Sequence, residues 1–460
     1  MITHSENSMP RIVSQYQAAT VVGLGATGFS VVRYLRARGI AVTVVDSNAA
    51  PALAPQLSKI YPEVIQKFGD LNVDQLTSAE LIVASPGVAL GEPEMRAAKQ
   101  NGAVIVGDIE LFLQENTKPV IAITGSNGKS TVTTLVGAMC RSGGKVALVA
   151  GNIGLPVLDA LTDQVDYDVA ILELSSFQLE TTTQVPAHAA AILNISADHM
   201  DRYDSMGDYV LAKARILRGA QRAVMPRHDD QLKQITSTGK LLSFDLDEPA
   251  NDSEYGLKRQ SNYRWLMRGE LRLMKLPEVP LVGLHNIKNV LSAFALVEFL
   301  SLPLECLVRA VKGFSGLAHR MQTVATKQGI TFVNDSKATN IGATSTALRN
   351  LESDVVWIAG GQGKGANFGE LRDAISSNIK LLVLIGEDAD KMEIALRGVL
   401  PIERANSMKE AVDLAAGRAA DPSIVLLSPA CASFDMFDNF EQRGDSFVQE
   451  VNSWITRGAA

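Results

Sequence analysis

The chain has 460 residues, too many for one ordinary hydrophobic core, so we expect about two to four domains. Apolar residues make up 46% of the sequence and charged residues 20%, a balance typical of a globular protein. The net charge of -7 argues against a nucleic-acid partner, since a general nucleic-acid binder would carry a basic face.

The first hundred residues alternate short apolar runs with one helical pattern. We expect strands at 20–23, 41–46 and 81–84, with a helix over 29–38 between the first two strands. This βαβ rhythm predicts a parallel sheet. The same rhythm restarts at Val120.

The second stretch predicts strands from residue 120 and at 146–150, 169–174 and 190–195, then a helix over 208–218, a hairpin turning at 268–270 and a helix over 286–300. A third series predicts strands at 331–333, 355–359, 381–385 and 424–427. The fold class is therefore α/β. We expect three domains, at 1–107, 108–316 and 317–460, with Rossmann-like outer domains and a mixed sheet in the central one.

No targeting or membrane segment is apparent in the sequence. Residues 1–14 lack the basic flank and apolar core of a signal peptide, and no apolar run reaches the roughly 18 residues of a membrane span. Cys140, Cys306 and Cys431 are scattered without metal-ligand spacing, which indicates reduced thiols. We therefore expect a cytoplasmic protein without a membrane span.

Residues 119–131 read PVIAITGSNGKST, an apolar strand, a glycine-bracketed loop and the start of a helix. Glycine allows the chain to approach a phosphate closely, and a helix N-terminus attracts an anion. Lys129 supplies a compact charge, and the Ser130 hydroxyl suits Mg²⁺. Ile123 stands where a full Walker A motif has glycine. A plain strand-to-helix turn is the alternative, but the pattern favours ATP binding with magnesium.

Residues 23–28, GLGATG, match the dinucleotide fingerprint, and Asp46 ends the next strand. Taken alone, this motif indicates an NAD-dependent dehydrogenase, and glycines for a tight turn are another interpretation. The narrower prediction is a pyrophosphate resting on the helix N-terminus near Thr27, which UDP satisfies as well as NAD. Residues 85–87 follow a strand whose end faces the same ligand.

Polar residues follow the central strands. Glu173 ends one strand, where a carboxylate can bind Mg²⁺, and Asn152 follows another. His199 lies among carboxylates just past a third strand, which favours a ligand over a structural role. Glu173 also has a structural interpretation as a surface or capped carboxylate, and Asn152 as a turn residue. Spacing alone gives Lys213 no role.

Together these motifs resemble the Mur ligase family, the ATP-dependent amide ligases of peptidoglycan precursor synthesis and their folate relatives. The resemblance covers essentially the whole chain and rests on separated motifs: the loop 125–131, Gly151-Asn152, Glu173, Asp198-His199-Met200-Asp201, Gly283-Leu284-His285-Asn286 with Asn289, and His319-Arg320. It implies a UDP-binding first domain, a central ATPase domain and an amino-acid-binding third domain.

The third domain distinguishes branches of the family. Residues 334–340, NDSKATN, resemble the D-glutamate-adding branch, and the stretches 360–364 and 427–435 agree with it. The resemblance implies an enzyme that joins D-glutamate to UDP-N-acetylmuramoyl-L-alanine through an acyl phosphate, in the synthesis of the cell wall on which cell shape and division depend.

The resemblance also implies cofactors and catalytic positions. The cofactors are ATP and two Mg²⁺ ions. The implied ATP-binding positions are Gly125, Ser126, Asn127, Gly128, Lys129, Ser130, Thr131, Asn286, Asn289, Arg320 and Asp335. The implied metal ligands are Ser130, Glu173, His199 and, once carbamylated, Lys213. Lys129, Glu173, His199 and Lys213 form the implied catalytic set.

Substrate positions follow from the resemblance in the same way. For the UDP-linked substrate they are Thr27, Asp46, Ser47, Ser85, Gly87 and Asn152, and for D-glutamate they are Lys337, Thr339, Lys364, Ser433 and Phe440. Two positions depart from the family pattern. Gln322 stands where the family often has Glu, and Asn48 where a basic residue can contact uracil.

Three alternatives remain open from the sequence. The chain could be another amino-acid-adding Mur ligase, or an NAD-dependent oxidoreductase built on residues 23–28. It could also be a non-catalytic nucleotide sensor, although the joint presence of Lys129, Glu173, His199 and Lys213 argues against lost chemistry. We expect a monomer.

Overall fold

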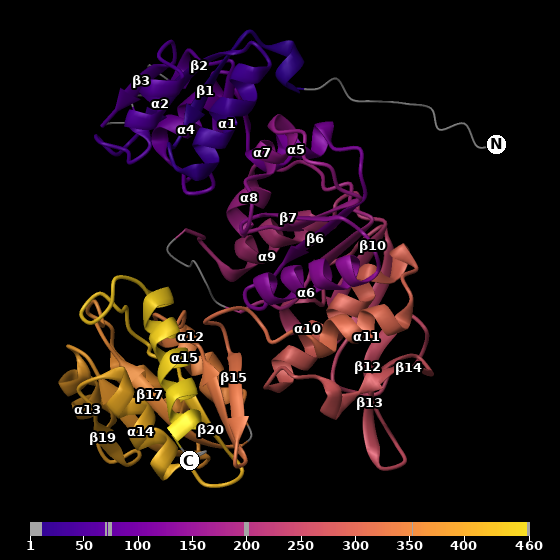
Figure 1. Ribbon diagram of the computed structural model, residues 1–460. Coiled ribbons are helices and arrows are strands. Elements are labelled where there is room, and N and C mark those ends of the chain that lie inside the picture. The colour runs from indigo at the N-terminus through magenta and orange to yellow at the C-terminus, as the bar shows by residue number, and fades with distance from the viewer. Residues whose placement is uncertain (1–11, 70, 72–75, 197–201, 352, 458–460) are drawn as a thin grey trace. The chain divides into compact units, whose positions relative to one another are not determined.

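The computed structural model describes residues 12–69, 71, 76–196, 202–351 and 353–457. Helices alternate with strands, and the strands form three sheets (Figure 1), which confirms the expected α/β class. The contacts divide the chain into two compact units. The first runs to Lys258 and includes 266–273 and 291–307, and the second contains 259–265, 274–290 and the chain from Val308. Within the described residues, no helix is long and apolar enough to cross a membrane.

The first sheet belongs to the first unit and has the order β3-β2-β1-β4-β5, with every adjacent pair parallel. A short 3-10 helix at Ile12–Gln15 precedes it. Its elements are β1 (Ala18–Val22), α1 (Ala26–Ala37), β2 (Ala41–Asp46), α2 (Ala54–Ile60), β3 (Ile65–Phe68), β4 (Leu81–Ala84), α4 (Pro93–Gln100) and β5 (Val104–Val106). The strand order reverses between β1 and β4. The loops that follow these two strands therefore face the same crevice.

The second sheet has nine strands in the order β14-β13-β12-β11-β10-β9-β6-β8-β7. Its strands are β6 (Val120–Thr124), β7 (Ala147–Gly151), β8 (Val169–Glu173), β9 (Ala189–Ile192), β10 (Arg222–Pro226), β11 (Lys240–Phe244), β12 (Glu254–Gln260), β13 (Tyr263–Arg268) and β14 (Leu271–Lys275). The expected hairpin is present as β13 and β14, because a two-residue connection can only join antiparallel neighbours.

The helices of this section are α5 (Asp108–Glu115), α6 (Lys129–Ser142), α7 (Val157–Thr162), α8 (Ser176–Glu180), α9 (Met206–Ala214), α10 (Leu284–Val297) and α11 (Leu304–Lys312). The prediction of a helix over 208–218 was wrong at its end. Helix α9 ends at Ala214, and a 3-10 turn at Arg215–Leu217 follows it. Further 3-10 turns lie at Asp230–Leu232, Leu276–Glu278 and Glu298–Leu300, the last at the end of the helix expected over 286–300.

The third sheet lies in the second unit, in the order β15-β16-β20-β17-β18-β19. Only the pair β15–β16 is antiparallel. The elements are β15 (Gln322–Lys327), β16 (Ile330–Asn334), α12 (Ile341–Arg349), β17 (Asp354–Gly360), a 3-10 helix at Phe368–Ala374, β18 (Ile379–Ile385), α13 (Ala389–Leu396), β19 (Ile402–Arg404), α14 (Met408–Arg418), β20 (Ser423–Leu427) and α15 (Phe440–Arg457). All four strands expected here are confirmed.

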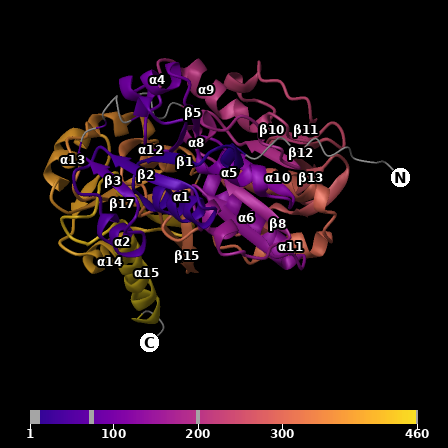
Figure 2. The ribbon, with the colours of Figure 1, turned by 90° about the horizontal axis from the view of Figure 1, so that it is seen from above.

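The central strands β6 and β8 are buried along their whole length, as expected for parallel strands covered on both faces. Helix α6 packs against β7 and β8, and Figure 2 shows it alongside β8. Since β6, β7 and β8 are parallel, their carboxyl ends meet at one edge of the sheet. That edge carries the loop 125–128, Glu173 and the residues after Gly151.

Candidate active site

The loop between β6 and α6 has a backbone that requires glycine. Gly125 has φ of 155° and Gly128 has φ of 82°, both in the region that side chains rarely adopt. A Cβ atom on Gly125 would lie 3.0 Å from the Leu193 Cβ, so a side chain there would also crowd the residue that follows β9. Helix α6 begins directly afterwards, with Gly128 as its N-cap. The expected strand, loop and helix are therefore present.

The loop is already held by hydrogen bonds within the protein. Lys129 Nζ donates to the carbonyl oxygens of Gly125 at 2.8 Å and Ser126 at 3.0 Å. The backbone N–H groups of Ser126 and Asn127 donate to Asn194, at 3.0 Å to its carbonyl and 2.9 Å to its Oδ1. Asn194 Nδ2 donates back to the Asn127 carbonyl at 3.0 Å. Two loop amides are thus engaged with Asn194, a residue that the sequence did not single out.

The start of α6 presents backbone donors to an anion. The first N–H groups of a helix lack an intrahelical acceptor, and here they belong to Lys129, Ser130 and Thr131. The helix dipole adds positive potential at the same place. Ser130 is 7% exposed, so its hydroxyl lies inside the structure. This end of α6 can bind phosphate oxygens.

Glu173 ends β8 and is 1% exposed. In the parallel registers it is opposite Ile123 of β6 and Gly151 of β7. Its Oε1 accepts a hydrogen bond from Asn152 Nδ2 at 2.9 Å, whereas its Oε2 is buried without a hydrogen-bond partner among the described residues. A buried carboxylate oxygen without a donor is costly unless a cation binds it. Glu173 therefore fits the magnesium that the sequence predicts.

Lys213 lies on α9 and is only 2% exposed. Its Nζ donates to the Gly125 carbonyl at 3.0 Å and to Thr124 Oγ1 at 3.4 Å, and it lies 4.8 Å from the centre of the Tyr209 ring. The Tyr209 hydroxyl is 3.0 Å from Ser126 Oγ. The fold thus brings Lys213 to the loop, although sequence spacing gave it no role.

His199, the other predicted metal ligand, lies outside the described residues. Among the residues that the structure does describe, no cluster of three or more His, Cys, Asp or Glu side chains could hold a metal. Magnesium accepts hydroxyl, phosphate and water oxygens as well as carboxylates, so Ser130 and Glu173 still suit it.

The glycine motif of the first sheet forms the second candidate anion site. Gly23 has φ of 92°, and a Cβ atom on Gly28 would lie 1.9 Å from the Gly23 carbonyl oxygen. Ser85 Oγ donates to that carbonyl at 2.9 Å and joins the loops after β1 and β4. Helix α1 begins at Ala26, three residues before the expected start, so Thr27 lies in its first turn. Gly87 is exposed in the loop after β4.

Asp46, at the end of β2, uses both carboxylate oxygens on the backbone. Its Oδ2 accepts from the N–H of Leu24 at 2.6 Å, and its Oδ1 accepts from the N–H of Asn48 at 2.8 Å. Asp46 therefore shapes the glycine loop and the turn that follows β2. Ser47 and Asn48 are exposed beside it.

Two predicted ATP-binding asparagines are buried near the start of α10. Asn286 Nδ2 donates to the Val282 carbonyl at 2.7 Å, and Asn289 Nδ2 donates to Asn286 Oδ1 at 3.1 Å. A small cavity of 190 Å³ in the second unit is lined by Gly283, Leu284 and other mainly apolar residues. Neither asparagine lines this cavity, but the Val282 that accepts from Asn286 does.

Asp335 follows β16 and is 8% exposed. Ser428 Oγ donates to its Oδ2 at 2.9 Å, and the N–H of Met321 donates to its Oδ1 at 3.2 Å. Burial raises the pKa of this carboxyl to about 7, although these hydrogen bonds and the charge of Arg320 oppose the shift. Arg320 is half-buried.

Two of the predicted D-glutamate residues, Lys337 and Phe440, lie together at the start of α15. Lys337 Nζ lies 4.7 Å from the centre of the Phe440 ring, and Lys364 Nζ lies 5.0 Å from that of Phe434. Both lysines are exposed, as is Thr339, whereas Ser433 is 2% exposed. The residues 362 and 432 pair through two backbone hydrogen bonds, both at 2.9 Å. The fold thus joins the segments that carry Lys364 and Ser433.

Arg443 supports these segments from within. It is 1% exposed, and its guanidinium donates to Ser336 Oγ at 3.0 Å, to the Ser336 carbonyl at 2.8 Å and to the Cys431 carbonyl at 3.0 Å. Ser336 Oγ donates to the Phe440 carbonyl at 2.8 Å. Burial lowers the pKa of Arg443 to about 10, so it remains charged at neutral pH. One guanidinium therefore joins the loops after β16 and β20.

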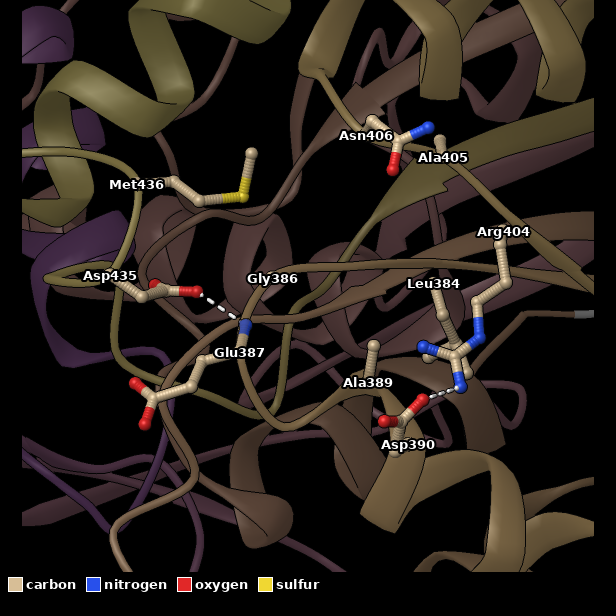
Figure 3. Close-up of a pocket in the computed structure, with 10 residues that line it drawn as sticks. All are labelled: Leu384, Gly386, Glu387, Ala389, Asp390, Arg404, Ala405, Asn406, Asp435 and Met436. Atoms are coloured by element: carbon tan, nitrogen blue, oxygen red, sulfur yellow. Dashed lines mark hydrogen bonds and ion pairs between the residues drawn. The ribbon is translucent and has the colours of Figure 1, made fainter.

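A larger hollow of 740 Å³ lies at the carboxyl ends of β18 and β19 (Figure 3). Glu387, Asp390 and Asp435 line it, and Arg404 is already paired with Asp390 at 2.6 Å. Asp435 Oδ2 accepts from the Glu387 N–H at 2.8 Å. Three of the four charged residues in this lining are acidic. The hollow is therefore unsuited to an anionic amino acid such as glutamate.

Comparisons with known proteins point to one family over most of the chain. Three family models match it: "Mur ligase MurD-like, N-terminal domain" over residues 17–107, "Mur ligase middle domain" over 123–297 and "Mur ligase, glutamate ligase domain" over 319–431. A UDP-N-acetylmuramoylalanine--D-glutamate ligase of Methylobacillus flagellatus is 46% identical, covering 94% of this chain and 96% of its own. The chain belongs to the Mur ligase family. A ligase of the same name from Pseudomonas fluorescens is 44% identical over 94% of this Mur ligase and 97% of its own length.

A solved structure supports the fold of this Mur ligase. The UDP-N-acetylmuramate-alanine ligase MurC of Thermotoga maritima has a TM-score of 0.55 at 18% identity, and the match covers 95% of this chain and 99% of that one. The expected three-domain α/β fold is thereby confirmed. At this identity the likeness concerns the fold alone.

Sequence reasoning missed three residues that organise the site of this Mur ligase. Tyr209 was detectable, because it precedes Lys213 by four residues and helical neighbours at that spacing share a face. Arg443 lies three residues after Phe440 on α15, but its hydrogen bonds go to Ser336 and Cys431 on other loops, which local spacing does not reveal. Asn194 had no such signal, because its role depends on a contact with a loop 67 residues away.

Proposed function

We propose that this Mur ligase catalyses the ATP-dependent addition of D-glutamate to UDP-N-acetylmuramoyl-L-alanine, a step of peptidoglycan precursor synthesis. The observation that carries the proposal is the near full-length similarity, at 44% and 46% identity, to ligases named for this reaction. The match of residues 319–431 to a glutamate ligase domain supports the same amino acid.

The chemistry requires activation of a carboxylate, which is a poor acyl donor. The carboxylate oxygen of the alanyl group attacks the γ-phosphorus of ATP, the bond from that phosphorus to the β-phosphate bridge breaks, and ADP leaves. The amine of D-glutamate then attacks the carbonyl carbon of the acyl phosphate and loses a proton. The carbon–oxygen bond to phosphate breaks, which releases inorganic phosphate and leaves the amide.

The described residues of the phosphate loop suit the first step. The N–H groups at the start of α6 and the Lys129 ammonium would bind the phosphates, and Lys129 would exchange its two carbonyl acceptors for phosphate oxygens. Ser130 and Glu173 would hold Mg²⁺, which would offset the repulsion between the two reacting anions. We propose His199 and a carbamylated Lys213 for a second ion. Carbamylation would turn the ammonium into an N–H group that bears a carboxylate, so one Nζ–H would remain to donate to either the Gly125 carbonyl or Thr124 Oγ1 while the new oxygens accept.

Other positions are proposed by the substrates that they suit. Thr27, Asp46, Ser47, Ser85, Gly87 and Asn152 are proposed for the UDP-linked substrate, and Asn286, Asn289, Arg320 and Asp335 for ATP. Lys337, Thr339, Lys364, Ser433 and Phe440 are proposed for D-glutamate. The two lysines would pair with the carboxylates of the amino acid, and neither is buried in the protein.

We further propose domain boundaries near residues 107 and 316, a monomeric enzyme and a cytoplasmic location, where ATP is supplied. The oxidoreductase alternative is not supported, because the model that matches the first glycine motif is a Mur ligase domain. Among the Mur ligases, the near full-length relatives favour the D-glutamate branch over other amino acids.

The test is phosphate release from ATP with UDP-N-acetylmuramoyl-L-alanine and single D- or L-amino acids. We expect release with D-glutamate alone and a product heavier by one glutamyl residue. Release confined to another amino acid would move the enzyme to a different branch of the family. Binding of ATP without release in any mixture would favour a nucleotide sensor.

A further inference from the structure

Arg202 joins the central sheet region to the loop that follows β4. Its Nη1 donates to the Pro86 carbonyl at 3.2 Å, and its Nη2 donates to the Val88 carbonyl at 2.9 Å. These two carbonyls lie on either side of Gly87. The guanidinium therefore holds the backbone of this loop at two points, next to a residue proposed for the UDP-linked substrate.

The other contacts of Arg202 fix the guanidinium itself. Its Nη2 also donates to Glu180 Oε2 at 2.8 Å, and its Cζ lies 4.1 Å from the centre of the Phe177 ring. Glu180 Oε1 accepts from the Tyr203 hydroxyl at 2.5 Å. The Arg202 and Glu180 side chains are 13% and 17% exposed, so this ion pair is largely shielded from water. A planar guanidinium can make all these contacts at once, whereas a lysine ammonium is a point charge.

The support for Arg202 begins at the proposed metal site. Phe177 and Glu180 lie on α8, which starts three residues after Glu173. A capping box fixes that start, because Ser175 Oγ accepts from the Gln178 N–H at 3.2 Å and the Gln178 side chain accepts from the Ser175 N–H at 3.1 Å. The position of Arg202 is thereby tied to the end of β8.

The loop and α8 also form the walls of a cavity. It has a volume of 570 Å³ and is lined by Gly87, Ala89, Leu90, Gly91, Phe177, Glu180 and Arg202. All of these residues belong to the first compact unit. A change in the Arg202 contacts would therefore alter one wall of the cavity next to the proposed substrate loop.

We infer that Arg202 is a positioning residue for the UDP-linked substrate, because it fastens the loop 85–88 to α8. The inference rests on the proposed function for the identity of that substrate. Ser85 already ties the start of the loop to Gly23. Arg202 holds its far end, so the loop presents Ser85 and Gly87 in one arrangement and loses little entropy when the substrate binds.

The test compares two arginines of the first unit. Each links an element of the first sheet region to a helix of the central sheet region. Arg33 pairs with Asp159 and Asp163, both at 2.6 Å, and joins α1 to α7 without touching the loop 85–88. We would measure the affinity of the full chain for UDP-N-acetylmuramoyl-L-alanine and for ATP by calorimetry in Arg202→Ala, Arg202→Lys and the control Arg33→Ala. Hydrogen exchange of the Val88 amide, which donates to Ser85, reports the loop without any substrate.

We expect Arg202→Ala to weaken binding of the UDP-linked substrate roughly tenfold, to leave ATP affinity within about twofold and to speed Val88 exchange. Arg202→Lys should restore only part of the loss, and Arg33→Ala should leave all three measurements unchanged. Unchanged Val88 exchange in Arg202→Ala, or an equal loss of ATP affinity, would overturn the inference. Full rescue by lysine would refute the role of the planar fork.

Failure of the proposed function would be seen separately. Wild-type protein that does not bind the UDP-linked substrate would overturn that function and the choice of substrate. The comparison of Val88 exchange in Arg202→Ala and Arg33→Ala would still decide whether Arg202 holds the loop 85–88.

Discussion

The phosphate loop of the first unit and the proposed D-glutamate residues of the second unit use lysine in opposite ways. Lys129 and Lys213 donate to loop carbonyls, and Lys213 is almost completely buried. Lys337 and Lys364 are exposed and rest over aromatic rings. In the phosphate loop the lysine ammonium groups are hydrogen-bonded within the protein, whereas the proposed D-glutamate lysines are exposed on the surface.

This difference implies that the two regions would gain affinity for their ligands, ATP and D-glutamate, in different ways. An ammonium over an exposed ring gains on the order of 1 kcal/mol, so Lys364 can leave the Phe434 ring, which is 62% exposed, at little cost when a carboxylate arrives. At the phosphate loop, the backbone is already ordered and binding needs little rearrangement. The surface lysines depend instead on Arg443, which positions the segments beneath them.

The largest effect should follow from the loss of Lys129. Lys129→Ala removes the charge that would face the phosphates in the transition state, and we expect kcat to fall roughly 1,000-fold. Circular dichroism should show an intact fold, because Asn194 still holds the loop. A mutant with near wild-type kcat would mean that the α6 N-terminus alone stabilises the phosphates.

Removal of Arg443 should destabilise the second unit, because the loops after β16 and β20 lose the guanidinium that joins them. Arg443→Ala leaves two buried carbonyls and Ser336 Oγ without this donor, so we expect the free energy of unfolding to fall by about 3 kcal/mol. Urea unfolding measures this loss. The KM for D-glutamate should rise more than the KM for ATP, and equal changes in both would contradict a frame specific to the amino acid.

Asp335 gives the second region a pH dependence of stability. The folded pKa of Asp335, about 7, lies above the ordinary aspartate value of 3.8. The stability that the neutral carboxyl contributes is therefore full below about pH 4 and is lost as pH rises through 7. Asp335→Asn stays neutral and can keep both contacts, because its amide can donate to Ser428 and its oxygen can accept from Met321.

We therefore expect Asp335→Asn to be more stable than wild type at pH 8, by on the order of 2 kcal/mol, and nearly equal to it at pH 4. Chemical unfolding at the two pH values measures this difference. A constant difference between the two proteins at both pH values would refute titration of Asp335 as its cause.

The smallest effect should come from substitution of Lys364, which is exposed on the surface. Lys364→Met keeps an unbranched side chain against Phe434 but removes the charge, so we expect the KM for D-glutamate to rise roughly tenfold with little change in stability. Lys409→Met, which alters an exposed helical ion pair with Asp413, is the matched control and should change neither quantity. Equal KM values for Lys364→Met and Lys409→Met would remove Lys364 from the pocket.

The sequence predicted most strands and the phosphate loop because these depend on local patterns. The runs that became β6 and β8 are continuously apolar, and the glycines at 125 and 128 indicate a backbone that side chains disfavour. The helical stretch after Ala214 was overestimated, because periodicity cannot distinguish an α-helix from a following 3-10 turn.

Contacts between distant segments were beyond the sequence patterns. Neither the Asn194 bonds to the loop nor the Lys213 contact with Gly125 follows from spacing, since each depends on how β6, β9 and α9 are brought together. The third-domain residues came from family resemblance rather than periodicity. Arg443 was missed because a charged residue on a helix is most often exposed.

The bonding of Asn127 and Ser126 within the protein has a consequence for inhibitors. The Ser126 hydroxyl faces Tyr209 and Ser196, so an anion at the start of α6 would be bound by backbone N–H groups together with the Lys129 ammonium. A single substitution can change a side chain but cannot delete a backbone N–H, except by introducing proline. A phosphate mimic bound here would therefore leave the cell few routes to drug resistance, because most changes in loop shape would also weaken ATP binding.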